Sequence, residues 1–175
     1  MKNIVATLSL LFATTLSAQV AIGKATVSSP AVSLEFYDNA DNTRGIILPW
    51  VTNTAAVTGA VNGTLVYNTA DKKIYVKYAS GWRDLSVDNT GTVTTTLQDS
   101  LTDQDTAKVL IGGDPSTDTT PGILVLADTN KAMVLPKVAS PHLNIVNPSP
   151  GMIVYDTTKK QLAVFNGTVW SFWKP

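Results

Sequence analysis

The chain contains no cysteine, one histidine and one glutamate, and these scarcities exclude several kinds of chemistry. Without cysteine there is no disulfide framework, no thiol nucleophile and no cysteine ligand for a metal. His142 has no second histidine with which to form a zinc site, and beside Pro141 it lies in an expected loop rather than in a catalytic triad. Because Glu35 is the only glutamate, a carboxylate pair for glycoside hydrolysis has few candidates. We therefore expect no enzymatic activity, no cofactor and no bound metal.

An excess of one charge and a membrane-length apolar run are also missing. Equal numbers of basic and acidic residues give a formal net charge of zero, which does not favour a nucleic-acid or anionic-lipid partner. The apolar run from Ile4 to Leu16 is shorter than the roughly 20 residues of a membrane span. With Lys2 before it and small residues up to Ala18 after it, the run is typical of a secretory signal. We predict a signal peptide at residues 1–18, a mature chain from Gln19 and no membrane span.

The most informative feature that is present is an internal repeat. The stretch GTLVYNTADKKIYVKYASGW at 63–82 returns as GMIVYDTTKKQLAVFNGTVW at 151–170, 88 positions later. Upstream of these stretches, RGIILP at 44–49 corresponds to KAMVLP at 131–136, and VAIG corresponds to VLIG. The offsets between the copies differ by only one or two residues, a change that turns can absorb. The chain therefore contains one structural unit twice.

Each copy alternates apolar and polar residues, which is the period of a β-strand. An opening hairpin is predicted in the first copy, with one strand around Leu34 and Phe36, a polar turn, and a second strand at 46–48. The second copy shows the same pattern. The long repeated stretches predict three-stranded meanders, and Asn166-Gly167 predicts a two-residue type I′ turn in the second. The expected fold is all-β, with two small tandem modules, each a hairpin plus a three-stranded meander. The predicted boundaries are module 1 at 19–86, a Thr/Asp-rich linker at 87–107 and module 2 at 108–175.

The order of these motifs resembles a known group of exported proteins. Ser17-Ala18-Gln19-Val20, the RGIILP segment, the Gly-x-x-Val-Tyr-Asn-Thr segment from Gly63 and the closing Gly-x-Trp are similar to tail-fibre-like repeat modules of flavobacteria and other Bacteroidetes. Their usual text is close to VGIGT, KGLLLPR, GLMIYNTT and YNGTAW. The resemblance implies a structural module, a homotrimer as in fibre-like relatives, and a location in the periplasm, at the outer-membrane surface or outside the cell.

Aromatic residues gather in the two meanders and allow two interpretations. Side chains exposed on a sheet can stack on sugars or peptides, whereas large aromatics also form the core of a small sheet or a subunit interface. The candidate binding or interface residues are Trp82, Tyr155, Phe165, Trp170 and Trp173.

The resemblance also implies O-glycan acceptors in Asp-Ser/Thr triplets, the acceptor pattern of Bacteroidetes. The candidates are Ser100, Thr106, Thr119 and Thr157. The alternative is a chance match in segments rich in Thr and Asp, which favour turns.

Two functional hypotheses follow. The first is a non-enzymatic structural or adhesive component of the outer envelope or cell surface, acting through its repeated β modules as a homo-oligomer. Oligomerisation would relieve the exposed strand edges and small cores of such modules. In such an assembly we expect Leu97 and Leu101 in the linker to form one helical turn against a neighbouring chain. The second is a soluble binding module or accessory subunit that docks on an outer-membrane protein or surface glycan through its aromatic residues.

Overall fold

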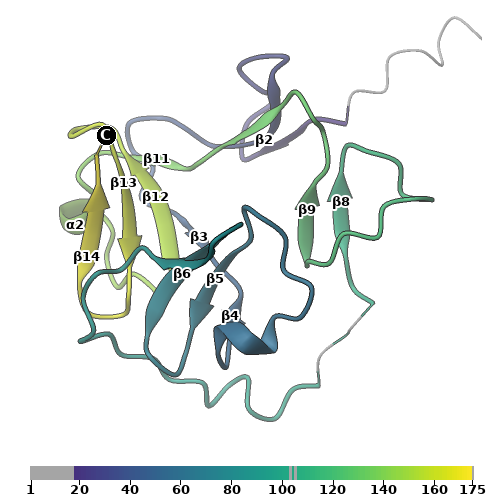
Figure 1. Ribbon diagram of the computed structural model, residues 1–175. Helices are drawn as coiled ribbons and strands as arrows, with labels where there is room; N and C mark the ends of the chain where they lie inside the picture. Colours follow the sequence, from purple (N-terminus) through teal and green to yellow (C-terminus); the bar gives the residue numbers. More distant parts are fainter. Residues whose placement is uncertain (1–17, 103, 105, 175) are drawn as a thin grey trace, which may run out of the picture.

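A computed structural model describes residues 18–102, 104 and 106–174, and this part of the chain is almost entirely β (Figure 1). Its strands form four sheets, accompanied by a 3-10 turn, η1 (Thr54–Ala56), and a short helix, α2 (Pro141–Asn144). The predicted all-β class is confirmed. Within the same residues no helix has the length and apolar character needed to cross a membrane. The predicted signal peptide lies outside the described residues except for Ala18.

The strands occur in the same order in the two copies. The first copy contains β1 (Val20–Ile22), β2 (Val32–Phe36), β3 (Ile46–Ile47), β4 (Trp50–Val51), β5 (Leu65–Asn68), β6 (Lys73–Tyr78) and β7 (Gly81–Asp84). The second contains β8 (Val109–Ile111), β9 (Leu124–Leu126), β10 (Ala132–Val134), β11 (Lys137–Val138), β12 (Met152–Asp156), β13 (Gln161–Phe165) and β14 (Trp170–Trp173). Thus β1 corresponds to β8, β2 to β9, and so on to β7 and β14.

Both predicted meanders are present. Strands β5, β6 and β7 pair antiparallel in sequence order, and β12, β13 and β14 do the same. Each meander gains a short parallel edge strand, β4 in the first copy and β11 in the second. The period-2 alternation therefore located these strands correctly, because successive residues of a strand point to opposite faces. In β12 and β13 both faces are covered, since Ile153 and Val164 belong to one hydrophobic cluster and Met152, Val154 and Phe165 to another.

The predicted opening hairpins are wrong. Strand β2 pairs in parallel with β1 and with β10 of the other copy, and β3 pairs antiparallel with β12 of the other copy. The segment after β2 is held against the second copy by the buried Asn42, whose amide donates to the carbonyl of Lys137 at 3.1 Å. The same amide donates to the carbonyls of Tyr37 and Arg44, so these bonds fix a loop and not a tight reversal.

The predicted two-residue turn at Asn166-Gly167 is also wrong. Phe165 pairs with Trp170, so four residues connect β13 and β14. The side-chain oxygen of Asn166 accepts hydrogen bonds from the backbone N–H of Thr168 and Val169 at 2.9 and 2.7 Å. An Asn side chain that bonds its own loop in this way stabilises a longer connection.

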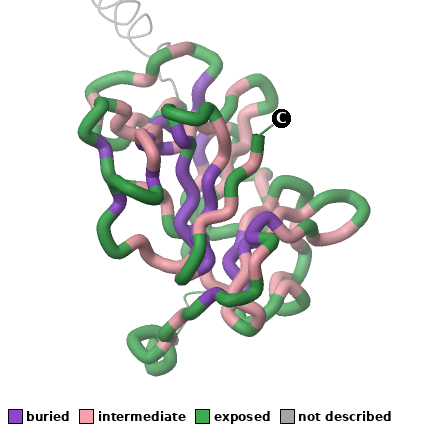
Figure 2. The backbone as a smooth tube through the Cα atoms, turned by 90° about the vertical axis from the view of Figure 1, so that its left-hand side faces the viewer, coloured by how far each residue is buried: buried purple, intermediate pink, exposed green. Residues whose placement is uncertain are grey.

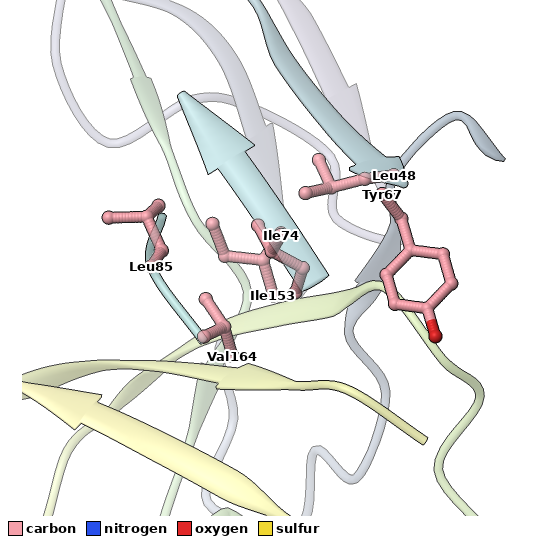
Figure 3. Packing of buried hydrophobic residues seen from close by; sticks show 6 residues of the cluster. All are labelled: Leu48, Tyr67, Ile74, Leu85, Ile153 and Val164. Carbon is pink, nitrogen blue, oxygen red and sulfur yellow. The ribbon is translucent and has the colours of Figure 1, made fainter. Parts of the chain in front are cut away.

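One hydrophobic cluster joins the two copies (Figure 3). Leu48, Tyr67, Ile74 and Leu85 from the first copy pack with Ile153 and Val164 from the second. A second cluster lies inside the second copy around Val154. In Figure 2 the buried segments run side by side through the interior, and exposed segments form the loops around them. The two modules are thus packed on each other, while the module boundaries stay a prediction.

Side-chain hydrogen bonds also cross between the copies. The hydroxyl of Tyr67 donates to the carbonyl of Asn166 at 2.9 Å, and the indole of Trp50 donates to the carbonyl of Pro150 at 2.9 Å. Burial raises the pKa of Tyr67 to about 12, so the phenol stays protonated and keeps donating. Part of the predicted linker is packed as well, because the hydroxyl of Thr92 donates to the carbonyl of Gly167.

The shared core predicts that the copies unfold together. Replacing Ile153, which is 3 % exposed, should lower the free energy of unfolding, because Ile153→Ala removes buried methyl groups and leaves a cavity. We expect a loss of about 2–5 kcal/mol in urea denaturation. The control Leu143→Ala, at a position 73 % exposed, should change stability by less than about 0.5 kcal/mol. Two separate unfolding transitions in the unaltered protein would contradict a shared core.

Candidate assembly surface

The junction between the two copies consists of two backbone ladders. In the first, β2 and β10 pair in parallel, with Leu34 opposite Met133 and a bulge near Ala132. In the second, β3 and β12 pair antiparallel, with Ile47 opposite Met152. Each ladder pairs an edge of the first copy with an edge of the second, so the junction satisfies backbone groups that either copy alone would leave open.

The same strand edges recur in the second copy without their partners. Strand β9 corresponds to β2 and pairs with β8, but no strand of the described residues pairs with its other edge. The exposed fractions of equivalent side chains differ accordingly. Leu34 on β2 is 1 % exposed, whereas Leu124 on β9 is 47 % exposed. In Figure 1 the β8–β9 pair stands apart from the four-stranded sheet β4–β7 and from the five-stranded sheet that contains β11–β14. An open β edge with apolar side chains is a typical site for pairing with another chain.

Several of the exposed apolar side chains lie on this strand pair, just before β9 or in the preceding linker. They are Leu97, Leu101, Val109, Ile123 and Leu124. Gln98 and Asp99 donate backbone hydrogen bonds to the carbonyl of Thr95, so the segment around Leu97 makes the predicted helical turn. Whether a neighbouring chain covers Leu97 and Leu101 stays a prediction.

A buried carboxylate organises the shared sheet beside this junction. On β2, Glu35 accepts a hydrogen bond from the backbone N–H of Ser28 at 2.5 Å, and the Lys24 ammonium lies 3.0 Å away. Burial acts to raise the pKa of Glu35, but the bond from Ser28 and the charge of Lys24 outweigh it and hold the pKa below its ordinary value. The contact with Glu35 in turn raises the pKa of Lys24. Ionised Glu35 therefore holds the loop that joins β1 to β2.

The structure brings four of the five aromatic candidates together in two separate pairs, Trp82 with Trp173 and Phe165 with Trp170. Trp82 on β7 and Trp173 on β14 line one shallow hollow with Arg83, whose guanidinium carbon lies 5.5 Å from the centre of the Trp173 ring. The indole N–H of Trp173 donates to the carbonyl of Leu85 at 2.6 Å, so this side chain also joins the two meanders.

The other three aromatic candidates lie away from this hollow. Phe165 is buried and packs against Trp170, with ring centres 5.2 Å apart. Tyr155 points outward from β12 and is among the more exposed large side chains. Thus Trp170 and Phe165 serve the inner cluster of the second copy, and only Trp82, Trp173 and Tyr155 present aromatic surface outside it.

All four candidate glycan acceptors are exposed. Ser100 and Thr106 lie in the predicted linker, Thr119 lies before β9, and Thr157 follows β12. The aspartate before Thr157 is buried and accepts hydrogen bonds from the backbone N–H of Thr158 and Ser140, so it has a local structural role. Exposure is compatible with modification of the four hydroxyls, which stays a prediction.

A metal site on the described surface would require several ligand side chains that lie close together. No group of three or more His, Asp or Glu side chains in residues 18–102, 104 and 106–174 lies close enough to hold a metal ion. His142 is exposed, and its ring lies nearly perpendicular to that of Phe172, with the ring centres 5.7 Å apart. The open cleft beside β2 contains Asp41 and Tyr37, but the hydroxyl of Tyr37 donates to Asp41 at 3.1 Å. Backbone edges, apolar side chains and the hollow at Trp82 and Arg83 are available to a partner.

Residues 114–174 match a family model described as the phage tail like trimerisation region. This segment contains β9 to β14 and is shorter than half of the chain. No curated protein and no solved structure matches the chain. In this segment the chain is therefore similar to trimerising structural proteins of the tail-fibre kind.

The lowered pKa of Glu35 predicts sensitivity to acid. Its folded pKa lies below the ordinary value of 4.5, so its contribution to stability is present above that pH and is lost as the pH falls through the folded pKa. We expect Glu35→Gln to be less stable than the unaltered protein at neutral pH and to lose less stability on acidification. Urea denaturation at neutral pH and at about pH 3 measures both effects. An equally steep acid loss in the variant would contradict this role.

Proposed function

We propose that the protein is an exported, non-enzymatic structural component of the outer envelope or extracellular surface, and that it works as a homotrimer. The observation that carries the proposal is the coincidence of two features in one segment. The family match spans 114–174, and the open apolar edge of β9 lies inside it. A strand edge that has a partner in the first copy and none in the second is supplied with one by oligomerisation.

Export and surface location rest on the sequence. The leader pattern at residues 1–18 and the resemblance to tail-fibre-like modules of Bacteroidetes support them. The absence of cysteine is compatible with an exported protein that gains its stability from sheet packing and subunit contacts instead of disulfides. An adhesive role at the surface follows from the same resemblance.

A second candidate is a binding module that docks on an outer-membrane protein or a surface glycan. The hollow at Trp82, Arg83 and Trp173 supports it, because a half-exposed indole beside a guanidinium is suited to stacking on a sugar or a peptide. The variant Trp82→Ala separates the two functions. A structural role predicts an unchanged trimer and unchanged cell-surface retention, whereas a binding role predicts loss of cell-surface retention with the trimer intact.

The first test is the native mass of the protein, measured by light scattering over a dilution series. We expect a species three times the mass of one chain. Leu124→Lys should raise the concentration at which the trimer dissociates by about tenfold or more, since a charge on an open edge opposes pairing. Leu143→Lys, on the exposed α2, is the matched control and should leave the trimer unchanged. A monomer at every concentration would overturn the proposal.

A further inference from the structure

We propose that the contact between subunits repeats the contact between the two copies inside one chain. The second copy of one subunit would then pair with the first copy of the next through two ladders, β9 with β3 and β10 with β5. This inference rests on the proposed trimer and specifies its interface. It follows from the strand equivalence, because within the chain β2 pairs with β10 and β3 pairs with β12.

The free edge of β9 has the backbone groups that this pairing needs. Val109 donates to the carbonyl of Ile123 at 2.8 Å, and Ala127 donates to the carbonyl of Ile111 at 2.9 Å. The odd-numbered residues of β9 therefore bond to β8. Since backbone groups alternate in direction along a strand, the N–H and C=O of Leu124 point to the open side. On β2 the equivalent residue, Leu34, lies in register with Met133 of β10.

Strand β3 has the matching free edge. Leu48 donates to the carbonyl of Gly151 at 3.0 Å, and Ile46 lies opposite Ile153 in the same antiparallel ladder. Ile47 lies between these bonded positions, so its N–H and C=O point away from β12. The equivalent of Ile47 on β10 is Val134. The backbone N–H of Ala132, two residues before Val134, donates to the carbonyl of Ala31, which directly precedes β2, at 2.8 Å. Val134 therefore directs its own backbone N–H and C=O to the same side, toward β2. Those of the equivalent Ile47 on β3 face away from the chain's own sheet. A strand beside β3 could therefore be bonded as β2 is bonded to β10.

The second proposed ladder, β10 with β5 of the next subunit, also has free backbone groups on both facing edges. The N–H of Ala132 points to β2, so Met133, the next residue, directs its backbone groups to the other side. On β5, Lys77 donates to the carbonyl of Thr64, which leaves the groups of Leu65 facing away from β6. The equivalent of Leu65 on β12 is Ile153, which is paired with Ile46. In the proposed junction Met133 lies opposite Leu65 of the next subunit, and Val134 lies opposite Thr64.

The side chains agree with this geometry. Ile47 on β3 is 49 % exposed and Leu124 on β9 is 47 % exposed, so both proposed edges present apolar surface to solvent in the single chain. Pairing would bury them as Leu34 is buried on β2. Removing such apolar side chains from water favours the pairing.

The direction of the junction determines the kind of assembly. Copy 2 contacts copy 1 of the next chain, so the interface is head-to-tail, and a head-to-tail interface gives either a closed ring or an open array. The match of 114–174 to a trimerisation region favours closure at three chains, which is a ring of six copies.

Cysteine cross-linking tests the junction, because the chain has no native cysteine. Val134 and Thr64 correspond to Ile47 and Met152, a non-bonded antiparallel pair whose close Cα atoms suit a disulfide. Full-length chains carrying Val134→Cys are mixed with tagged chains carrying Thr64→Cys, dissociated, reassembled and oxidised. The matched control replaces Val134→Cys by Met133→Cys, whose side chain lies on the opposite face of β10. Ile47→Cys with Met152→Cys in one chain is the positive control for the ladder geometry.

We expect cross-linked heterodimers from Val134→Cys with Thr64→Cys, at least tenfold more than from the Met133→Cys control. One chain carrying both substitutions should give covalent species that stop at three chains. A trimeric mass without the Val134–Thr64 cross-link, while the Ile47–Met152 control oxidises, would overturn the junction and leave the trimer standing. Covalent ladders beyond three chains would overturn the closed ring. A monomeric native mass would overturn the proposed function, and the junction with it.

Discussion

The backbone edge of a β-strand carries N–H and C=O groups that need partners, and the arrangement of this protein depends on how those groups are paired. The opening strands do not fold back on their own copy. Strand β2 takes β10 as its neighbour, and β3 takes β12, so each edge is completed by the other copy. This exchange brings Tyr67 and Ile74 into one cluster with Ile153 and Val164, which gives two small meanders a common core without any disulfide.

The same pairing accounts for the open strand edge that the proposed assembly uses. The strand edges of the first copy pair with strands of the second copy. The equivalent edges of the second copy have no partner strand in the described chain. Strand β9 has one of these edges, and its position inside 114–174 coincides with the match to a trimerisation region. A subunit contact of the same kind as the internal contact requires no new recognition chemistry, because the strands and their directions are already present. The proposed assembly therefore uses the same strand pairing that holds the two copies of one chain together.

The side chains around the core are consistent with a structural protein. Buried polar groups such as Asn42, Asn166 and Asp156 bond to backbone atoms of loops, and Glu35 bonds to the loop before its strand. Aromatic residues divide in the same way, since Phe165 and Trp170 pack inside while Trp173 joins the two meanders through Leu85. The outward surface at Trp82 and Arg83 is the part of this set that a ligand could contact.

The sequence by itself determined the repeat, the all-β class and the meanders, because alternation and residue type are local properties of the chain. It could not determine the partners of β2, β3 and β10, since RGIILP and KAMVLP read as strands in either pairing. Asn42 was readable only as a turn residue, and Leu34 and Leu124 occupy equivalent places in the pattern although one is buried and the other exposed. Only the tertiary structure decided these points, because the neighbour of a strand edge is set by contacts between residues far apart in the chain.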